Sequence, residues 1–227
     1  MKKTGTLYII ATPLGNLQDM TYRAVDTLKN DIDIVYCEDT RVTRRLLSAF
    51  DINLPTHSLH SHSSVMKVEG AVEKLRDGKN IAYMSDCGTP GVSDPGSRLV
   101  QVAAAAGIQV VPLPGVSALT AIVSVSGFAS RNILFAGFIS KKPGRRINEL
   151  SRLAEFDGTI VLYESPHRIT KTLLAIAEIF PDKNAVLGRE MTKLYEEYTR
   201  YNTSDTEKVV AGLTVKGEFC IAIDNTA

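Results

Sequence analysis

The chain alternates short apolar runs with stretches of helical spacing. The apolar runs predict strands buried on both faces at residues 6–11, 33–36, 80–84 and 108–113. Between them, apolar residues recur three and four positions apart, which predicts helices at residues 21–29, 42–50, 65–75 and 98–106. This alternation is typical of a parallel sheet with helices on both faces.

The pattern changes after Gly115. Strands are expected at residues 133–138, 159–163, 185–187, 197–201 and 218–223, and helices at residues 146–154, 168–179 and 206–213. Some of these strands follow one another closely, so the second sheet should be mixed. The fold class is therefore α/β with two domains, residues 1–118 with a parallel sheet and residues 119–227 with a mixed sheet. We expect the boundary inside a helix near residues 116–121.

Residues 99–130 contain no charged side chain. A membrane span is one interpretation, but Gly107, Pro112, Pro114 and Gly115 divide this stretch into pieces too short to cross a bilayer. A helix, a buried strand and a second helix fit better, and no membrane association is expected. Residues 1–5 carry no cleavage-site pattern of a secretory signal.

Composition narrows the protein class further. Hydrophobic residues make up 44% and charged residues 22%, as in ordinary globular proteins. The net charge of +1 excludes a uniformly basic coat for nucleic acid, but it leaves room for a local basic patch. Three cysteines lie far apart without a C-x-x-C pair, so a reducing, cytoplasmic location is expected and a disulfide scaffold or zinc knuckle is not.

Candidate chemistry lies directly after the predicted strands, where ligands bind in open parallel sheets. The segment at residues 85–96, SDCGTPGVSDPG, combines glycines that allow close backbone approach with the carboxylates of Asp86 and Asp94. Neither G-x-x-x-x-G-K-[ST] nor G-x-G-x-x-G occurs, which argues against an NTPase or a dinucleotide-dependent dehydrogenase. The acidic loop suits a ligand with an ammonium group or hydroxyls.

Six such segments stand in a recognisable order: residues 12–19, 38–41, 85–96, 114–118, 163–168 and 189–193. With them the chain resembles the tetrapyrrole methylase superfamily, the class III S-adenosylmethionine methyltransferases, and within it the ribosomal RNA small subunit methyltransferase I family. The resemblance implies two α/β domains with a cofactor cleft between them. It also implies S-adenosylmethionine as cofactor, 2′-O-methylation of a cytidine in the decoding region of small-subunit (16S) ribosomal RNA, and a homodimer.

The resemblance also assigns cofactor contacts, from both domains. They are Pro13, Leu14, Cys87, Gly88, Thr89, Val92, Ser117, Ala118, Tyr163 and Met191. One position departs from the superfamily, because Thr89 stands where its loop has an aspartate, so Asp86 is expected to substitute for that carboxylate. Some relatives continue into a helical extension past the strand ending near Asp224.

Methylating a ribose hydroxyl needs positioning and a general base. By position the candidates are Glu38, Asp39, Glu164, His167, Glu190 and Lys193. Glu190 or Glu164 is the preferred base. The alternative for each carboxylate is an ion-pair network.

Arginines and lysines near the same ends are candidates for phosphate binding. Residues 141–146, KKPGRR, place four basic residues within six, and we expect an exposed loop that binds RNA. The full set of expected RNA contacts is Arg41, Arg44, Arg45, Lys141, Lys142, Arg145, Arg146, Arg168, Arg189 and Lys193. The expected partner is ribosomal RNA or the assembled 30S subunit.

Other functions remain open at this point. His57, His60 and His62 lack a matching cysteine or carboxylate at ligand spacing, so no metal is expected. A tetrapyrrole or other small-molecule methyltransferase would use the same cofactor cleft, but the basic segment argues against it. A non-catalytic RNA-binding protein is the third possibility, and the carboxylates at positions 164 and 190 argue against that.

Overall fold

The structure is a computed structural model that describes residues 4–60 and 63–226. Contacts divide the chain into two compact units, residues 1–117 and 118–227. Each unit has its own sheet and its own buried core. The assignment of residues 1–118 and 119–227 as domains stays a prediction.

The first unit contains a five-stranded sheet in the order β3-β2-β4-β1-β5, and every pair of neighbours is parallel. The strands are β1 (Thr6–Ile10), β2 (Ile34–Cys37), β3 (Thr56–Ser58), β4 (Ile81–Met84) and β5 (Gln109–Leu113). In β1, Leu7 lies opposite Ile81 on one side and Val110 on the other. The strand formed first along the chain is therefore in the interior of the sheet.

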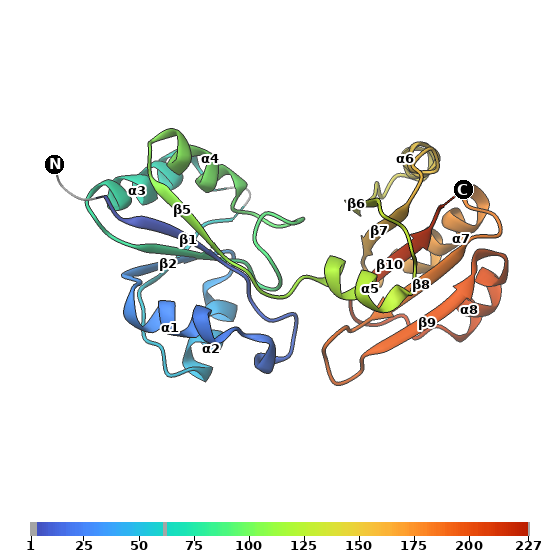
Figure 1. Ribbon diagram of the computed structural model, residues 1–227, viewed down its shortest axis with the longest axis horizontal. Helices are drawn as coiled ribbons and strands as arrows, with labels where there is room; N and C mark the ends of the chain where they lie inside the picture. The colour runs from blue at the N-terminus through green and yellow to red at the C-terminus, as the bar shows by residue number, and fades with distance from the viewer. Residues whose placement is uncertain (1–3, 61–62, 227) are drawn as a thin grey trace. The chain divides into compact units, whose positions relative to one another are not determined.

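Helices cover both faces of this sheet. Figure 1 shows α1 (Tyr22–Asn30) and α2 (Thr40–Ala49) on one face, and α3 (Val65–Arg76) and α4 (Ser97–Ala105) on the other. Leu28 and Leu47 pack with one face of the sheet, and Leu75 and Leu99 pack with the opposite face. Because both faces are covered, the interior strands β1, β2 and β4 need apolar residues at consecutive positions, which is the pattern read from the sequence. The expectation that β5 is buried on both faces is wrong, because β5 lies at the edge and Gln109 and Pro112 are exposed.

After the neighbouring strands β1 and β4, the chain crosses the sheet in opposite directions. The chain leaves β1 towards β2, whereas it leaves β4 towards β5 on the other side. Such a reversal opens a crevice at the carboxyl ends of the two strands, and ligands bind there in open α/β sheets. The topology thus points to residues 12–19 and 85–96.

The second unit has a mixed sheet in the order β6-β7-β10-β8-β9, in which β6 and β7 are parallel and the other neighbouring pairs are antiparallel. Its strands are β6 (Ile133–Phe138), β7 (Thr159–Glu164), β8 (Asn184–Arg189), β9 (Glu197–Asn202) and β10 (Phe219–Asp224). Its helices are α5 (Ala118–Ser126), α6 (Pro143–Leu153), α7 (Ile169–Ile179) and α8 (Thr206–Gly212). The predicted α/β class, with a parallel sheet followed by a mixed one, is confirmed.

Two further features differ from the sequence-based expectation. The edge strand β3 was not predicted, because residues 56–58 (Thr-His-Ser) are polar. The basic run is not a loop throughout, since Pro143 opens α6 and places Arg145 and Arg146 on a helix. The charge-free stretch forms a helix, a strand and a second helix (α4, β5 and α5), as expected, and no helix in the described part of the chain is long and apolar enough to span a membrane.

Candidate functional site

The loops after β1 and β4 are joined at the crevice of the first unit. The amide of Thr12 donates to the carbonyl of Gly88, and the amide of Gly88 donates to the carbonyl of Thr12, each over 2.9 Å. The Thr12 hydroxyl adds a bond to the Ser85 carbonyl at 3.1 Å. Gly88 has φ +79, and a Cβ there would lie 3.3 Å from Leu14. A residue with a side chain would be strained at this position and would narrow the space beside Leu14.

Thr89 connects the same loop to the segment after β5. Its hydroxyl donates to the carbonyl of Val116 at 3.1 Å. The sequence had placed Thr89 where the superfamily has an acidic residue. Here the Thr89 side chain stabilises the loop and carries no charge. Asp86 is therefore the carboxylate of this loop that lies nearest to Thr89 in the sequence.

Three carboxylates gather at the carboxyl end of this sheet. Oδ1 of Asp86 accepts from the amide of Asp39 at 3.0 Å. Burial, assisted by the nearby Asp39 charge, holds the pKa of Asp86 above its ordinary value of 3.8 despite that hydrogen bond. Burial likewise raises the pKa of Glu38, and the Asp86 charge adds to the shift. Asp39 differs, because hydrogen bonds from Arg41 lower its pKa to about 2.

The chemistry of this edge fits the cofactor implied by the resemblance. Partly buried carboxylates with raised pKa values are stabilised by a nearby cation. The methionyl part of S-adenosylmethionine carries both an ammonium and a sulfonium, and its ribose carries hydroxyls. Asp86, the positive-φ Gly88 and the paired loops supply acceptors and close backbone approach for such groups.

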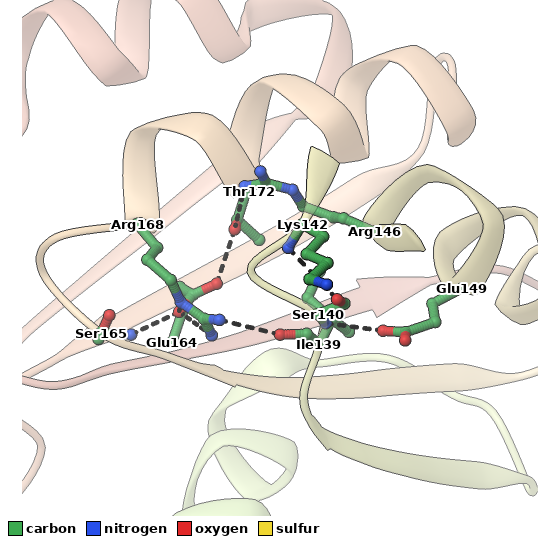
Figure 2. Close-up of polar contacts among 9 residues, drawn as sticks. All are labelled: Ile139, Ser140, Lys142, Arg146, Glu149, Glu164, Ser165, Arg168 and Thr172. Atoms are coloured by element: carbon green, nitrogen blue, oxygen red, sulfur yellow. Dashed lines mark hydrogen bonds and ion pairs between the residues drawn. The ribbon is translucent and has the colours of Figure 1, made fainter. Parts of the chain in front are cut away.

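In the second unit, Glu164 lies at the end of β7 and is 2% exposed. Figure 2 shows its carboxylate among three donors. Oε1 accepts from the Ser165 amide at 2.7 Å and from Nε of Arg168 at 2.6 Å, while Oε2 accepts from the Thr172 hydroxyl at 2.6 Å. Both carboxylate oxygens are therefore used within the unit, which favours the ion-pair interpretation of Glu164.

Arg146 belongs to this buried group. It is 6% exposed, and its Nη1 lies 3.4 Å from the Thr172 hydroxyl (Figure 2). The expectation that Arg146 stands in an exposed basic loop is wrong in this structure. Helical spacing from Pro143 turns it towards α7, whereas Lys141, Lys142 and Arg145 are exposed.

The turn before Lys142 is held by α6. The Ser140 amide donates to Glu149 Oε2 at 2.7 Å, and the Lys142 amide lies 3.3 Å from the Ser140 hydroxyl (Figure 2). Arg168 donates to the Ile139 carbonyl at 3.0 Å. The Glu164 group and the basic segment are thus tied to the same short turn.

Glu190 lies in a strained turn after β8. Its φ is +49 and that of Thr192 is +67, both unusual for residues with side chains. Oε1 of Glu190 accepts from Nζ of Lys193 at 2.9 Å and from the Glu218 amide at 3.0 Å. Burial raises the pKa of Glu190, but these hydrogen bonds outweigh it and leave the pKa below its ordinary value. Glu190 is thus ionised at neutral pH.

The remaining cofactor candidates of this unit lie near α5. The Tyr163 hydroxyl accepts from the amide of Leu119, one residue after Ala118 in α5. Met191 is 6% exposed and would collide with a side chain at Gly188. Ser117 directly precedes α5. Tyr163, Ala118 and Met191 thus share one side of the mixed sheet.

The expected RNA-binding residues fall into two groups. Several already contact protein: Arg41 pairs with Asp39, Arg44 donates to Thr56, Arg189 pairs with Glu197, and Lys193 bridges Glu190 and Glu218. The exposed ones with neither an ion pair nor a side-chain hydrogen bond among the described residues are Arg45, Lys141, Lys142 and Arg145. These four offer the least encumbered positive charge.

The histidines contribute no metal site within the described residues, where no three His, Cys, Asp or Glu side chains are placed to hold a metal ion. His57 lies in β3 with its ring 5.4 Å from that of Tyr36. His60 follows β3 rather than lying in it. His62 lies outside the described residues.

Sequence reasoning missed several contributors. Thr12 stood in a quoted segment without a role, although a buried threonine just after an apolar strand was a usable signal. Thr172 and Glu149 gave no such signal. Thr172 is four residues after Arg168 on one helix face, which only gains meaning once Glu164 is placed beside it.

Comparisons with known proteins show the family to which the chain belongs. A family model described as Tetrapyrrole (Corrin/Porphyrin) Methylases matches residues 6–206. A Leptospira biflexa protein called ribosomal RNA small subunit methyltransferase I is 42% identical over 224 residues, covering 99% of this chain and 92% of its own length. A Bacillus subtilis protein of the same name is 40% identical, covering 98% of this chain and 76% of its own length.

Solved structures with similar folds are more distant in sequence. A cobalt precorrin-4 methyltransferase has a TM-score of 0.72 at 17% identity, with 96% of this chain and 94% of that chain covered. A uroporphyrin-III C-methyltransferase from Thermus thermophilus, complexed with S-adenosyl homocysteine, has a TM-score of 0.64 at 15% identity, with 96% and 97% covered. These likenesses establish the fold.

Proposed function

Because the chain belongs to the ribosomal RNA small subunit methyltransferase I family of the tetrapyrrole methylases, we propose that it methylates a cytidine 2′-hydroxyl in the decoding region of small-subunit ribosomal RNA. The methyl donor is S-adenosylmethionine. The observation that carries the proposal is 42% identity across nearly the whole chain. The acidic crevice of the first unit supports the same donor, since burial holds the pKa values of Asp86 and Glu38 above their ordinary values despite the nearby Arg41 and His60, and a bound cation would stabilise both carboxylates.

The donor supplies an electrophilic methyl group on a sulfonium, and the protein positions it. We assign Asp86 to its ammonium group and the loop at Gly88 to close backbone contact. The other proposed contacts are those that the resemblance implies: Pro13, Leu14, Cys87, Thr89, Val92, Ser117, Ala118, Tyr163 and Met191. That cofactor residues come from both units stays part of the proposal.

We assign the general base to Glu190 rather than to Glu164. Glu190 is ionised and partly accessible, and two of its neighbours hold it through one oxygen. Glu164 uses both oxygens and is buried, so we give it a positioning role. Lys193 fixes Glu190 rather than binding phosphate.

The exposed basic segment supports the RNA part of the proposal. Lys141, Lys142 and Arg145 stand next to one another on the turn and first residues of α6. Exposed cations grouped in this way attract a phosphate backbone independently of sequence. We assign these three residues and Arg45 to RNA contact, with Arg41, Arg44, Arg168 and Arg189 as further candidates.

Family membership also supports a homodimer located in the cytoplasm, with the 30S subunit or its naked RNA as partner. Both remain proposals. Light scattering coupled to size exclusion measures the first directly, and a mass near 49 kDa, twice the 24.7 kDa chain, is expected. A monomer at micromolar concentration would contradict it.

The test of function offers labelled S-adenosylmethionine with 30S subunits, naked ribosomal RNA and a precorrin-type substrate. We expect label in ribosomal RNA, and 2′-O-methylcytidine after digestion to nucleosides. Label in the tetrapyrrole would support the small-molecule alternative. No label in any substrate, with donor binding intact, would support a non-catalytic RNA-binding protein.

A further inference from the structure

A second concave site lies in the first unit, beside the proposed cofactor loop. It is a cavity of about 500 Å³ at the carboxyl ends of β2, β3 and β4. Leu59, Val68 and Leu99 lie at its base and are almost fully buried, while Pro95 and Gly91 line it with accessible apolar atoms. Glu38, His60, Asp94 and Arg98 add polar groups to the same lining. A cavity with apolar walls and a few convergent polar groups is the usual form of a small-molecule or base-binding site.

The position of this cavity divides the sheet edge into two halves. The proposed cofactor residues follow β1, β4 and β5, whereas the cavity lies at β2, β3 and β4. The loop of residues 85–96 belongs to both, with Asp86 to Thr89 on the cofactor side and Gly91 and Ser93 to Gly96 on the cavity side. Among the described residues, none of the proposed cofactor contacts lines the cavity. A second ligand could therefore sit next to the methyl donor.

The polar groups select the chemistry of that ligand. Two carboxylates, Glu38 and Asp94, accept hydrogen bonds, and the Arg98 guanidinium donates them. Cytosine offers a matching edge, because its exocyclic amine donates to a carboxylate while its ring nitrogen and carbonyl accept. Uracil would place a carbonyl oxygen where cytosine has the amine, opposite a carboxylate. The accessible surface of Pro95 and Gly91 suits the face of a flat base, and the almost fully buried Leu59, Val68 and Leu99 close the base of the cavity.

We propose that this cavity receives the cytosine base of the acceptor nucleotide, drawn out of the RNA stack, with Glu38 and Asp94 reading its amine. Holding the base there presents its ribose to the donor bound on the other half of the sheet edge. Enzymes that modify nucleotides commonly extrude them in this way. The inference rests on the proposed function, and it adds the pocket that chooses the nucleotide.

The direction in which RNA affinity changes when the carboxylates are neutralised distinguishes base recognition from mere proximity to the RNA backbone. Carboxylates that merely flank a phosphate backbone repel it, so neutralising them strengthens RNA binding. Carboxylates that accept hydrogen bonds from a base contribute to RNA affinity, so neutralising them weakens RNA binding. Glu38→Gln and Asp94→Asn should each raise KM for 30S subunits about tenfold, in line with about 1.4 kcal/mol for a base contact.

The matched control is Glu69→Gln, which removes an exposed carboxylate from α3 outside the cavity lining. KM for 30S should stay within twofold, and the Kd of S-adenosylhomocysteine should stay within twofold for all three variants. An unchanged or lower KM for Glu38→Gln and Asp94→Asn overturns the proposal. So does a comparable loss of S-adenosylhomocysteine affinity, which would assign the cavity to the cofactor.

A filling variant tests the cavity by shape rather than charge. Ser97→Tyr places a ring at an exposed position in the lining, and Ala104→Tyr places the same ring on exposed α4 surface outside the lining. Only Ser97→Tyr should raise KM for 30S. Equal effects of the two variants count against a base in this cavity.

A titration of the unaltered protein with cytidine 5′-monophosphate and, separately, with uridine 5′-monophosphate tests base binding apart from methyl transfer. It therefore distinguishes failure of the cavity proposal from failure of the proposed function. Methyl resonances of Leu59, Val68 and Leu99 should shift with the cytidine nucleotide and not with the uridine nucleotide. This readout needs no methyl transfer, so it decides the cavity even where no RNA is labelled. Equal shifts with both nucleotides, or none, refute base recognition.

Discussion

The two units treat their carboxylates in opposite ways. At the parallel sheet, burial and mutual repulsion raise the pKa values of Glu38 and Asp86. In the mixed-sheet unit, Glu164 is held by Arg168 and Thr172, and Glu190 is held by Lys193. In the first unit burial outweighs the nearby Arg41 and His60 at these two carboxylates, whereas in the second unit each carboxylate is hydrogen-bonded to a lysine or arginine. We therefore expect the carboxylates of the parallel-sheet unit to bind a cationic ligand, and those of the mixed-sheet unit to stabilise the local structure.

This difference changes how acidic residues near strand ends should be interpreted. Position alone made Glu38, Glu164 and Glu190 candidates for the general base and Asp86 a candidate for the cofactor. The partners separate them, because a carboxylate whose oxygens are all used has little capacity for a ligand. The five predictions below test this separation.

The largest effect is expected from Glu164→Ala. It leaves Arg168 and Thr172 in a buried site without their acceptor, and breaking a buried pair costs about 3–5 kcal/mol of unfolding free energy. Chemical denaturation measures the loss. Glu73→Ala removes the partner of Arg76 at an exposed pair on α3 and should cost at most about 1 kcal/mol. Similar losses for the two variants would show that burial does not distinguish them.

Glu190→Gln should lower kcat for ribosomal RNA about a hundredfold, the size typical of a lost general base. Affinity for S-adenosylhomocysteine should hold. The control is Glu218→Gln, since Glu218 shares the Lys193 partner and is more exposed. If both variants lose the same activity, the ion pair with Lys193, and not proton abstraction by Glu190, accounts for the effect of Glu190→Gln.

Asp86→Asn should weaken S-adenosylmethionine binding about tenfold, equivalent to about 1.4 kcal/mol. The reason is loss of a charge-assisted partner for the ammonium. Calorimetry measures the constant, with Asp26→Asn on exposed α1 surface as control. Unchanged affinity in Asp86→Asn would remove the cation from this edge.

Neutralising the exposed basic segment should weaken RNA binding severalfold at physiological salt. The triple variant of Lys141, Lys142 and Arg145 to glutamine should also flatten the dependence of log affinity on log salt by about one per lost phosphate contact. Donor affinity should not change. Arg146 is left intact because its burial makes it structural. A triple variant of Lys29, Lys171 and Lys216, all exposed, controls for net charge, and equal losses would deny the segment a specific role.

The smallest effect is a fractional proton release. The pKa of Asp86 lies above its ordinary value of 3.8 in the free protein, so this group opposes folding at neutral pH, and the penalty disappears as pH falls through the raised pKa. A bound cation lowers that pKa, so binding releases protons and donor affinity falls on acidification towards pH 4. Calorimetry in buffers of different ionisation enthalpy detects the release, which should vanish in Asp86→Asn. Persistence in that variant would place the proton elsewhere.

Much of the fold could be predicted, because strands covered on both faces must be apolar at successive positions. That rule located β1, β4 and β7 within a residue or two. It fails for β3, whose residues 56–58 form an edge and need no such pattern. It also says nothing of the register shift between Phe135 and Gly137 in β6.

The candidate site was less predictable, because partners far apart in sequence decide it. Nothing near Glu164 in the sequence shows that Thr172 takes its second oxygen. Arg146 was assigned to a loop from its charged neighbours, although Pro143 was a helix-start signal that would have turned it inward. Pocket lining by Leu59 and Leu99 depends on strand order, which the apolar pattern does not contain.

The position of β1 in the interior of the sheet affects how the protein is made. Its two neighbours, β4 and β5, are synthesised more than 70 and 100 residues later, as the pairing of Leu7 with Ile81 and Thr6 with Gln109 shows. Until residue 113 has emerged, a nascent chain carries an apolar strand with an open edge, the kind of surface that promotes aggregation. Because of this strand order, we expect the β1 segment to be shielded during translation, either by a chaperone or by transient contacts with helices.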